Sequence, residues 1–152
     1  MGRNISVVKL GILEEDRDGN RHMGEQFYDL KFVEGRYILL AETGVGEKEL
    51  ANRDPPLAFY IERFYGEHPG QVLIGEEVKI ISWFGKYEKG PRIRINQEMR
   101  VDDKTVATKW LDYVFANISN WPNVKPIRPP KDLLTNIQEL EQVDIKSLSK
   151  SP

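Results

Sequence analysis

A single long helical segment, followed in the chain by strands, is the feature that most restricts how this sequence can fold. Residues 24–43 carry apolar side chains at helical spacing, and Gly44 follows as a typical helix stop. An apolar, β-branched strand is predicted at 5–14, and further strands are predicted near 57–66, 71–86, 91–102 and 104–117. Because no second crossover helix separates these strands, we expect them to pair antiparallel. The order of elements predicts an α+β fold.

The predicted helix is expected to fill the concave face of the sheet. Its strands are long, so the sheet must curve, and residues 24–43 form the one long apolar segment that can occupy the curve. One face of this helix is marked by Phe27, Leu30, Ile38 and Ala41. Other apolar residues fill much of the remaining surface, which predicts burial on most sides. Gly35 costs about 1 kcal/mol relative to alanine in a helix, and it predicts the close approach of another backbone. We therefore expect a curved antiparallel sheet wrapped around one long central helix.

The remaining segments are expected to be connections and a terminal extension. Residues 46–56 form a polar segment that ends in Asp54-Pro55-Pro56, and no helix or strand is assigned to it. Residues 118–130 are rich in proline and are predicted to form an extended arm, and 131–145 to contain a short amphipathic helix. The predicted organisation is a single domain over 1–134 and a C-terminal extension over 135–152, with a frayed end.

The composition restricts the partners of the chain. Its 152 residues suffice for one domain with a substantial core. Lys and Arg number 22 against 24 Asp and Glu, which gives no electrostatic reason to expect nucleic acid or a membrane as a partner. The chain has no cysteine, which excludes thiolate chemistry and favours a cytoplasmic location. Its two histidines lack metal-ligand spacing, so no metal site is predicted.

Three polar residues directly before the predicted helix are the candidate catalytic residues. Asp18, Asn20 and His22 occupy alternate positions, and backbone amides near Gly24 and Glu25 are expected at the start of the helix. A carboxylate, an amide and an imidazole at such a helix end can polarise a carbonyl and attack it. The structural alternative is that Asp18 and Asn20 only form an Asx turn and cap the helix.

This stretch resembles the hotdog-fold acyl thioesterases, which include 4-hydroxybenzoyl-CoA thioesterase-like enzymes and acyl-ACP thioesterases. The resemblance begins with Asp18, with His22 four residues and Tyr28 ten residues later. It continues through the downstream segments Glu34-Gly35-Arg36, Ile74-Gly75-Glu76-Glu77-Val78, Val106-Ala107-Thr108 and Ile127-Arg128-Pro129-Pro130. The motifs occur in the order found in that family, over roughly residues 5–134.

The resemblance implies an enzyme that hydrolyses an acyl-CoA or acyl-carrier-protein thioester and needs no cofactor. Asp18 would act as general base or nucleophile, and Asn20 and His22 would position the water or the carboxylate. The residues expected to bind substrate are Gly24, Glu25, Tyr28 and Glu67. Members of this family associate edge to edge with sites at the interface, so a homodimer or homotetramer is expected.

Departures from the family pattern keep two other functions open. Arg21 replaces a frequent glycine, and Gly24-Glu25 replaces a frequent Asn-Asn pair, which is compatible with a binding protein that has lost the chemistry. Hotdog hydratases carry a D-x-N-x-x-H pattern with the histidine five residues after the aspartate, whereas here the spacing from Asp18 to His22 is four. A serine hydrolase is disfavoured because no G-x-S-x-G motif occurs.

Two further groups of charged residues have both a structural and a functional interpretation. Glu34 and Arg36 are two apart on the predicted helix, so they do not face each other and are expected to find partners elsewhere. A basic set near one hairpin, which could either be solvated or meet CoA phosphates, consists of Lys86, Lys89, Arg92 and Arg94.

Overall fold

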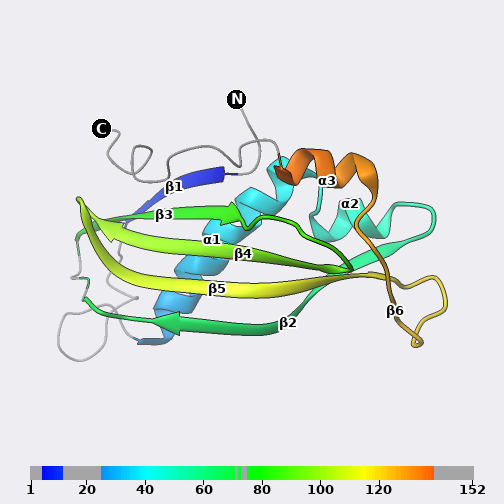
Figure 1. Cartoon of the computed structure of the whole chain (residues 1–152). Coiled ribbons are helices and arrows are strands. Elements are labelled where there is room, and N and C mark those ends of the chain that lie inside the picture. The colour runs from blue at the N-terminus through cyan, green and yellow to red at the C-terminus, as the bar shows by residue number, and fades with distance from the viewer. Residues whose placement is uncertain (1–4, 12–24, 71, 73–74, 139–152) are drawn as a thin grey trace.

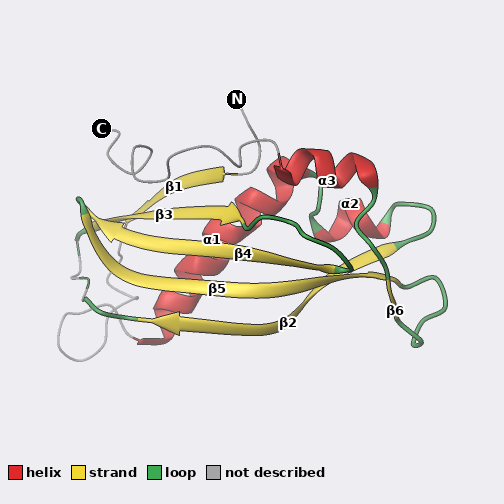
Figure 2. Ribbon diagram, viewed as in Figure 1, coloured by secondary structure: helices red, strands yellow, loops and turns green. Residues whose placement is uncertain are grey.

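The computed structural model describes residues 5–11, 25–70, 72 and 75–138. Its strands form one antiparallel sheet, and its helices lie against that sheet (Figure 2). This arrangement confirms the predicted α+β class. Within the described ranges, no helix is long and apolar enough to cross a membrane.

The sheet has the strand order β1-β3-β4-β5-β2, with β6 paired to β5. All of its neighbouring strands run antiparallel, as predicted. The strands are β1 (Ile5–Gly11), β2 (Leu57–Glu67), β3 (Glu77–Phe84), β4 (Arg92–Val101), β5 (Lys104–Asn117) and β6 (Lys125–Pro126). The two edges of the sheet are therefore β1 and β2, and the long strand β5 lies next to β2 (Figure 1).

Helix α1 (Glu25–Thr43) crosses one face of this sheet, where it contacts β1, β3 and β4 (Figure 1). Its end was correctly predicted, because Gly44 has a φ of +78° and the Val45 amide donates to the Leu40 carbonyl oxygen. Gly35 allows the close approach, but the neighbour is a side chain rather than a backbone. A Cβ added there would lie 2.5 Å from Cγ2 of Ile80 on β3.

The expectation that α1 is buried on most sides is wrong for the single chain. The side facing the sheet is buried, with Phe32 and Leu39 in the core. In contrast, Leu30, Tyr37 and Ile38 are 52%, 66% and 39% exposed. The apolar pattern around the helix therefore exceeds what the described part of the chain covers. Leu30, Ile38 and Ala41, the described residues that mark its apolar face, are all exposed.

Two short helices complete the core. Helix α2 (Glu47–Ala51) lies in the segment predicted to lack regular structure, and it buries Leu50. Helix α3 (Lys131–Gln138) lies within the predicted 131–145 helix and buries Leu133 and Ile137. These three side chains join a core cluster with the C-terminal half of α1, while the N-terminal half of α1 packs into a second cluster with β3, β4 and β5.

Strand β3 begins later than predicted. The sequence indicated a strand from residue 71, but β3 starts at Glu77. A turn precedes it, in which Gly75 has a φ of +92°. This left-handed conformation places the turn before the strand, and Val72, which is described, is not part of β3.

Candidate functional site

The structure describes only part of the predicted catalytic site. Outside the described residues lie Asp18, Asn20, His22 and Gly24. Glu25 begins α1, although its side chain also lies outside the described set. Of the predicted site, Tyr28 and Glu67 remain to be placed, and both lie near the same end of the molecule.

The start of α1 lies against the end of β2. The ring of Tyr28, which is buried, meets the ring of His68 edge to face with centroids 4.5 Å apart. Glu67 is the last residue of β2 and directly precedes His68. Two predicted substrate-binding residues, one from the helix and one from a strand distant in sequence, are thus brought to one end of the fold. His68 was not predicted as a site residue, and its position next to Glu67 was the signal for it.

Glu67 is exposed and has a hydrogen-bond partner on its own strand. The Tyr65 hydroxyl donates to Oε1 of Glu67 at 2.7 Å. This hydrogen bond to the carboxylate raises the pKa of Tyr65. The Glu67 carboxylate therefore remains accessible at the end of β2 and is held by a neutral donor.

Helix α1 places positive electrostatic potential at this end. It spans 19 residues from Glu25, and the amides of its first turn have no carbonyl acceptors within the helix. The aligned peptide dipoles are equivalent to roughly half a positive charge at the helix start. Such an end stabilises an oxyanion that develops next to it.

A buried polar network lies between α1 and the sheet. Nη1 of Arg36 donates to Oε1 of Gln97 at 2.9 Å. The Gln97 amide nitrogen donates to the Phe32 carbonyl oxygen at 2.8 Å and to Oγ of Ser82 at 2.9 Å. This network fixes the rotation of the Gln97 amide and holds one edge of the Arg36 guanidinium.

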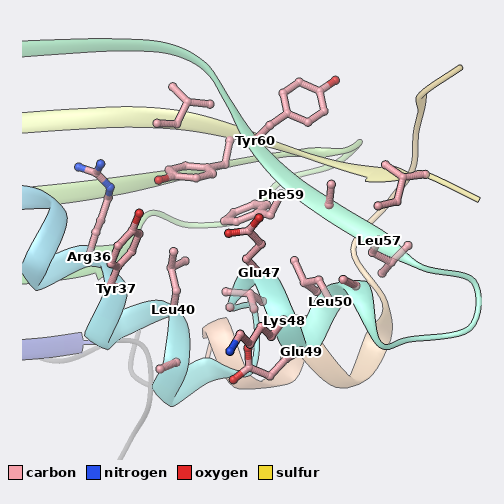
Figure 3. Close-up of a pocket in the computed structure, with 18 of the residues that line it drawn as sticks. Arg36, Tyr37, Leu40, Glu47, Lys48, Glu49, Leu50, Leu57, Phe59 and Tyr60 are labelled. Carbon is pink, nitrogen blue, oxygen red and sulfur yellow. The ribbon is translucent and has the colours of Figure 1, made fainter. Parts of the chain in front are cut away.

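A pocket of about 740 Å³ opens beside this network, between α1, α2 and β2. Figure 3 shows apolar side chains from all three elements turned toward it, among them Leu40, Leu50 and Phe59. Arg36 extends from α1 toward the strands on one side of it (Figure 3). A cavity of this size, mostly apolar with a few polar groups, has the character of a small-molecule site.

The basic residues considered for CoA phosphates are partly engaged elsewhere. Arg94 donates from Nε to the Asp112 carboxylate at 2.8 Å, and its Cζ lies 3.9 Å from the centroid of the Trp110 ring. Arg92 pairs with Glu62 at 2.6 Å. These two arginines are therefore neutralised by carboxylates on neighbouring strands, which favours the structural interpretation for them.

The Asp112 carboxylate is the most strongly paired acid described in the structure. It is 2% exposed, and it accepts hydrogen bonds from Arg94 and from Nε of Arg63 at 2.6 Å. Hydrogen bonding from Arg94, reinforced by Arg63, lowers the pKa of Asp112 despite its burial. Within the described ranges, no three His, Asp or Glu side chains gather as potential metal ligands.

Several solved structures are similar to this chain, although no protein-family model and no curated protein matches its sequence. A 1,4-dihydroxy-2-naphthoyl-CoA thioesterase from Synechocystis is 12% identical, with a TM-score of 0.77 over 91% of this chain and 99% of that chain. A probable thioesterase from Bartonella henselae is 19% identical, with a TM-score of 0.71 over 83% of this chain and 99% of that one. A Staphylococcus aureus protein solved in complex with CoA is 14% identical, with a TM-score of 0.78 over 91% and 85% of the two chains.

These similarities establish the fold of the chain. The architecture is shared with proteins that are named thioesterases, so the resemblance to the hotdog-fold thioesterases found in the sequence is confirmed at the level of the fold.

Proposed function

We propose that the protein hydrolyses acyl thioesters carried on CoA or on an acyl carrier protein. One observation carries this proposal. Helix α1 starts at Glu25, directly after the Asp18-x-Asn20-x-His22 motif, in a fold shared with proteins named thioesterases. A carboxylate can activate water, and the free amides of a helix start can stabilise the oxyanion, which are two contributions that hydrolysis of a thioester can use.

The chemistry follows from the parts supplied by the sequence and by α1. The thioester carbonyl binds with its oxygen toward the first-turn amides near Gly24 and Glu25, which stabilise the negative charge of the tetrahedral intermediate. Asp18 either removes a proton from the attacking water or attacks the carbonyl itself. Asn20 and His22 orient the water or the carboxylate. Water adds across the carbon–sulfur bond, so the products are a carboxylic acid and a thiol.

The end of β2 supplies the wall of this site. Tyr28 is buried against His68, so its ring fixes the distance between the helix start and the strand. Glu67 is exposed beside them and accepts a hydrogen bond, so it is available to contact polar groups of the substrate. We assign substrate contact to both Tyr28 and Glu67.

We also propose that the protein is a homo-oligomer joined through β2. In the described part of the chain β2 pairs only with β5, which leaves its other edge open. Every residue of β2 from Tyr60 onward is exposed, and Phe64 is 64% exposed. An apolar open edge favours pairing with a second copy. Association would also cover the exposed side of α1, so that the helix becomes central to the assembled protein.

The reaction is tested by measuring thiol release from a panel of acyl-CoA thioesters of different chain lengths. Asp18→Asn removes the carboxylate but keeps its volume, and Asp16→Asn is a matched control two residues earlier in the chain. Asp18→Asn should lower kcat/KM by about 10²- to 10⁴-fold, as loss of a general base does. Asp16→Asn should retain wild-type activity, and circular dichroism should show that both variants are folded.

Two results would contradict the proposal. One is an Asp18→Asn variant that hydrolyses the panel as fast as the wild type. The other is a wild-type protein that binds acyl-CoA but releases no thiol above the uncatalysed rate on either carrier, which would identify a non-catalytic binding protein.

A further inference from the structure

Within one copy of the chain, the pocket between α1, α2 and β2 lies away from the proposed catalytic end of α1. Arg36, which lines it, follows Glu25 by 11 residues. At 1.5 Å per residue, that separation is about 16 Å along the helix axis. The pocket is large enough for a small organic molecule.

Arg36 is a buried cation without a carboxylate partner among the described residues. The residue is 5% exposed, and its Nε finds no hydrogen-bond acceptor in the described part of the chain. Its hydrogen bonds there go to neutral groups, because Nη1 donates to Oε1 of Gln97 and the Tyr113 hydroxyl is a second partner. A buried guanidinium is costly unless an anion accompanies it. Because no described carboxylate balances this charge, an anion in the pocket that Arg36 lines would do so.

The surroundings of Arg36 are arranged to receive a carboxylate. Hydrogen bonds from its amide nitrogen to Phe32 and Ser82 fix the orientation of Gln97. The amide oxygen that accepts from Arg36 is therefore held in place. Tyr113, which is 5% exposed, also lines the pocket. Burial raises the pKa of Tyr113, whereas the charge of Arg36 and its hydrogen bond with the Tyr113 hydroxyl oppose that rise. A guanidinium and a phenol together provide several donors for two carboxylate oxygens.

The rest of the pocket restricts the occupant to a single negative charge. Its apolar lining includes Leu40, Leu57 and Phe59 (Figure 3). Glu47 and Glu49 line the pocket from α2, with Lys48 between them. These carboxylates disfavour a polyanion such as a nucleotide, because like charges repel at close range. A molecule with one anionic end toward Arg36 and an uncharged, apolar body matches both the guanidinium and the apolar lining.

We propose that this pocket binds a small monocarboxylate with an apolar body, whose carboxylate is held by the Arg36 guanidinium with the Tyr113 hydroxyl as a second donor. The affinity comes from the apolar walls, and the preference for an anion over a neutral analogue comes from Arg36. The site is a binding site and takes part in no bond-breaking step.

The test compares octanoate with octanamide, which has the same body without the charge, by isothermal titration calorimetry on the full chain. The wild type should bind octanoate about tenfold or more tightly than octanamide, since a hydrogen bond to a charged group contributes about 1.5–3 kcal/mol. Arg36→Gln should remove this preference. Arg128→Gln, which changes an exposed arginine outside the pocket, should keep it.

A milder variant keeps the test decisive if Arg36→Gln does not fold. Tyr113→Phe removes only the hydroxyl, and it should reduce the preference for octanoate by about threefold to tenfold. The proposal is overturned if the wild type binds both probes equally or neither of them. It is also overturned if folded Arg36→Gln, or Tyr113→Phe in its absence, binds octanoate with the wild-type preference.

Such a carboxylate has two possible sources, which kinetics can separate. If it belongs to the acyl group, the acyl chain must span the roughly 16 Å from the helix start, so Arg36→Gln should reduce kcat/KM for the CoA half-thioester of hexadecanedioic acid but not for hexadecanoyl-CoA. If it is a free acid, Arg36→Gln should hydrolyse both thioesters like the wild type, and only the preference for octanoate over octanamide should be lost. Equilibrium binding of octanoate requires no turnover, so a failure of the hydrolysis proposal would leave the binding result intact.

Discussion

Gly35 is the residue at which the packing of α1 on the sheet can be tested most directly. In Gly35→Ala, the new Cβ would lie 2.5 Å from Cγ2 and 3.1 Å from Cβ of Ile80. Ile80 is fully buried on β3, and its β-branched side chain has little freedom to move aside. Either α1 must move away from β3 or the Ile80 side chain must leave its preferred rotamer.

The magnitude follows from two opposing terms. Alanine is favoured over glycine within a helix by about 0.5–1 kcal/mol, whereas overpacking a core costs about 1–3 kcal/mol. Gly35→Ala should therefore reduce the free energy of unfolding by about 1–2 kcal/mol, which corresponds to a fall in Tm of about 2–8 °C for a domain of this size. Urea unfolding followed by circular dichroism measures the change. Glu42→Ala, at an exposed position of α1, is the matched control and should change stability by less than about 0.5 kcal/mol.

A double-mutant cycle separates this clash from a general effect on the helix. Ile80→Ala alone should cost about 2–5 kcal/mol through the cavity it leaves. In that background the clash is gone, so Gly35→Ala should stabilise the protein by about 0.5–1 kcal/mol through helix propensity. The reasoning is refuted if Gly35→Ala is neutral or stabilising in the wild type, or if it costs the same in both backgrounds.

Two further predictions concern the outer face and the edge of the sheet. Hydrogen bonding from Arg94 and Arg63 lowers the folded-state pKa of Asp112 below its unfolded value. The ionised carboxylate therefore stabilises the folded state above about pH 4, and this stabilisation is lost as the pH falls through the folded pKa. Asp112→Asn should therefore cost about 1.5–3 kcal/mol in urea unfolding at pH 6 and progressively less toward pH 3; an equal cost at both pH values would contradict the assignment. Ile61→Lys places a charge on the exposed edge strand β2 and should convert the proposed oligomer to a monomer, as measured by light scattering. The control Val124→Lys should leave the assembly unchanged. An oligomer that survives Ile61→Lys would exclude the β2 edge as the interface.

Local patterns predicted the elements whose determinants lie close together in the sequence. The end of α1 was predicted because Gly44 alone provides the left-handed residue that the stop needs. Helix α2 was missed because its five residues are too few to show a helical period, and burial of Leu50 in the tertiary core is what holds it. The start of β3 was misplaced because Gly75 adopts a turn conformation between the apolar residues 72–74 and the strand.

The pocket could not be predicted because its walls come from distant parts of the sequence. Arg36 belongs to a Glu-x-Arg pattern in the sequence, and a structural role with partners elsewhere was predicted for it. That expectation holds for its bond to Gln97, which lies 61 residues away. What the pattern could not show is that Phe59 and Tyr113 close a cavity beside the guanidinium. A charge is recognised as available for a ligand only once all of its neighbours are known.

The open edge of the sheet and the pocket are physically connected, because they share residues. Tyr37, Tyr60 and Ile61 line the pocket and are also among the large apolar side chains that remain exposed in a single copy. A second copy joined along β2 would cover side chains at the rim of the cavity. Removing water from that rim would strengthen the attraction between Arg36 and a bound carboxylate, since charges interact more strongly at a lower effective dielectric constant. The residues that make a single copy prone to associate are therefore also the ones that would make the pocket selective for an anion.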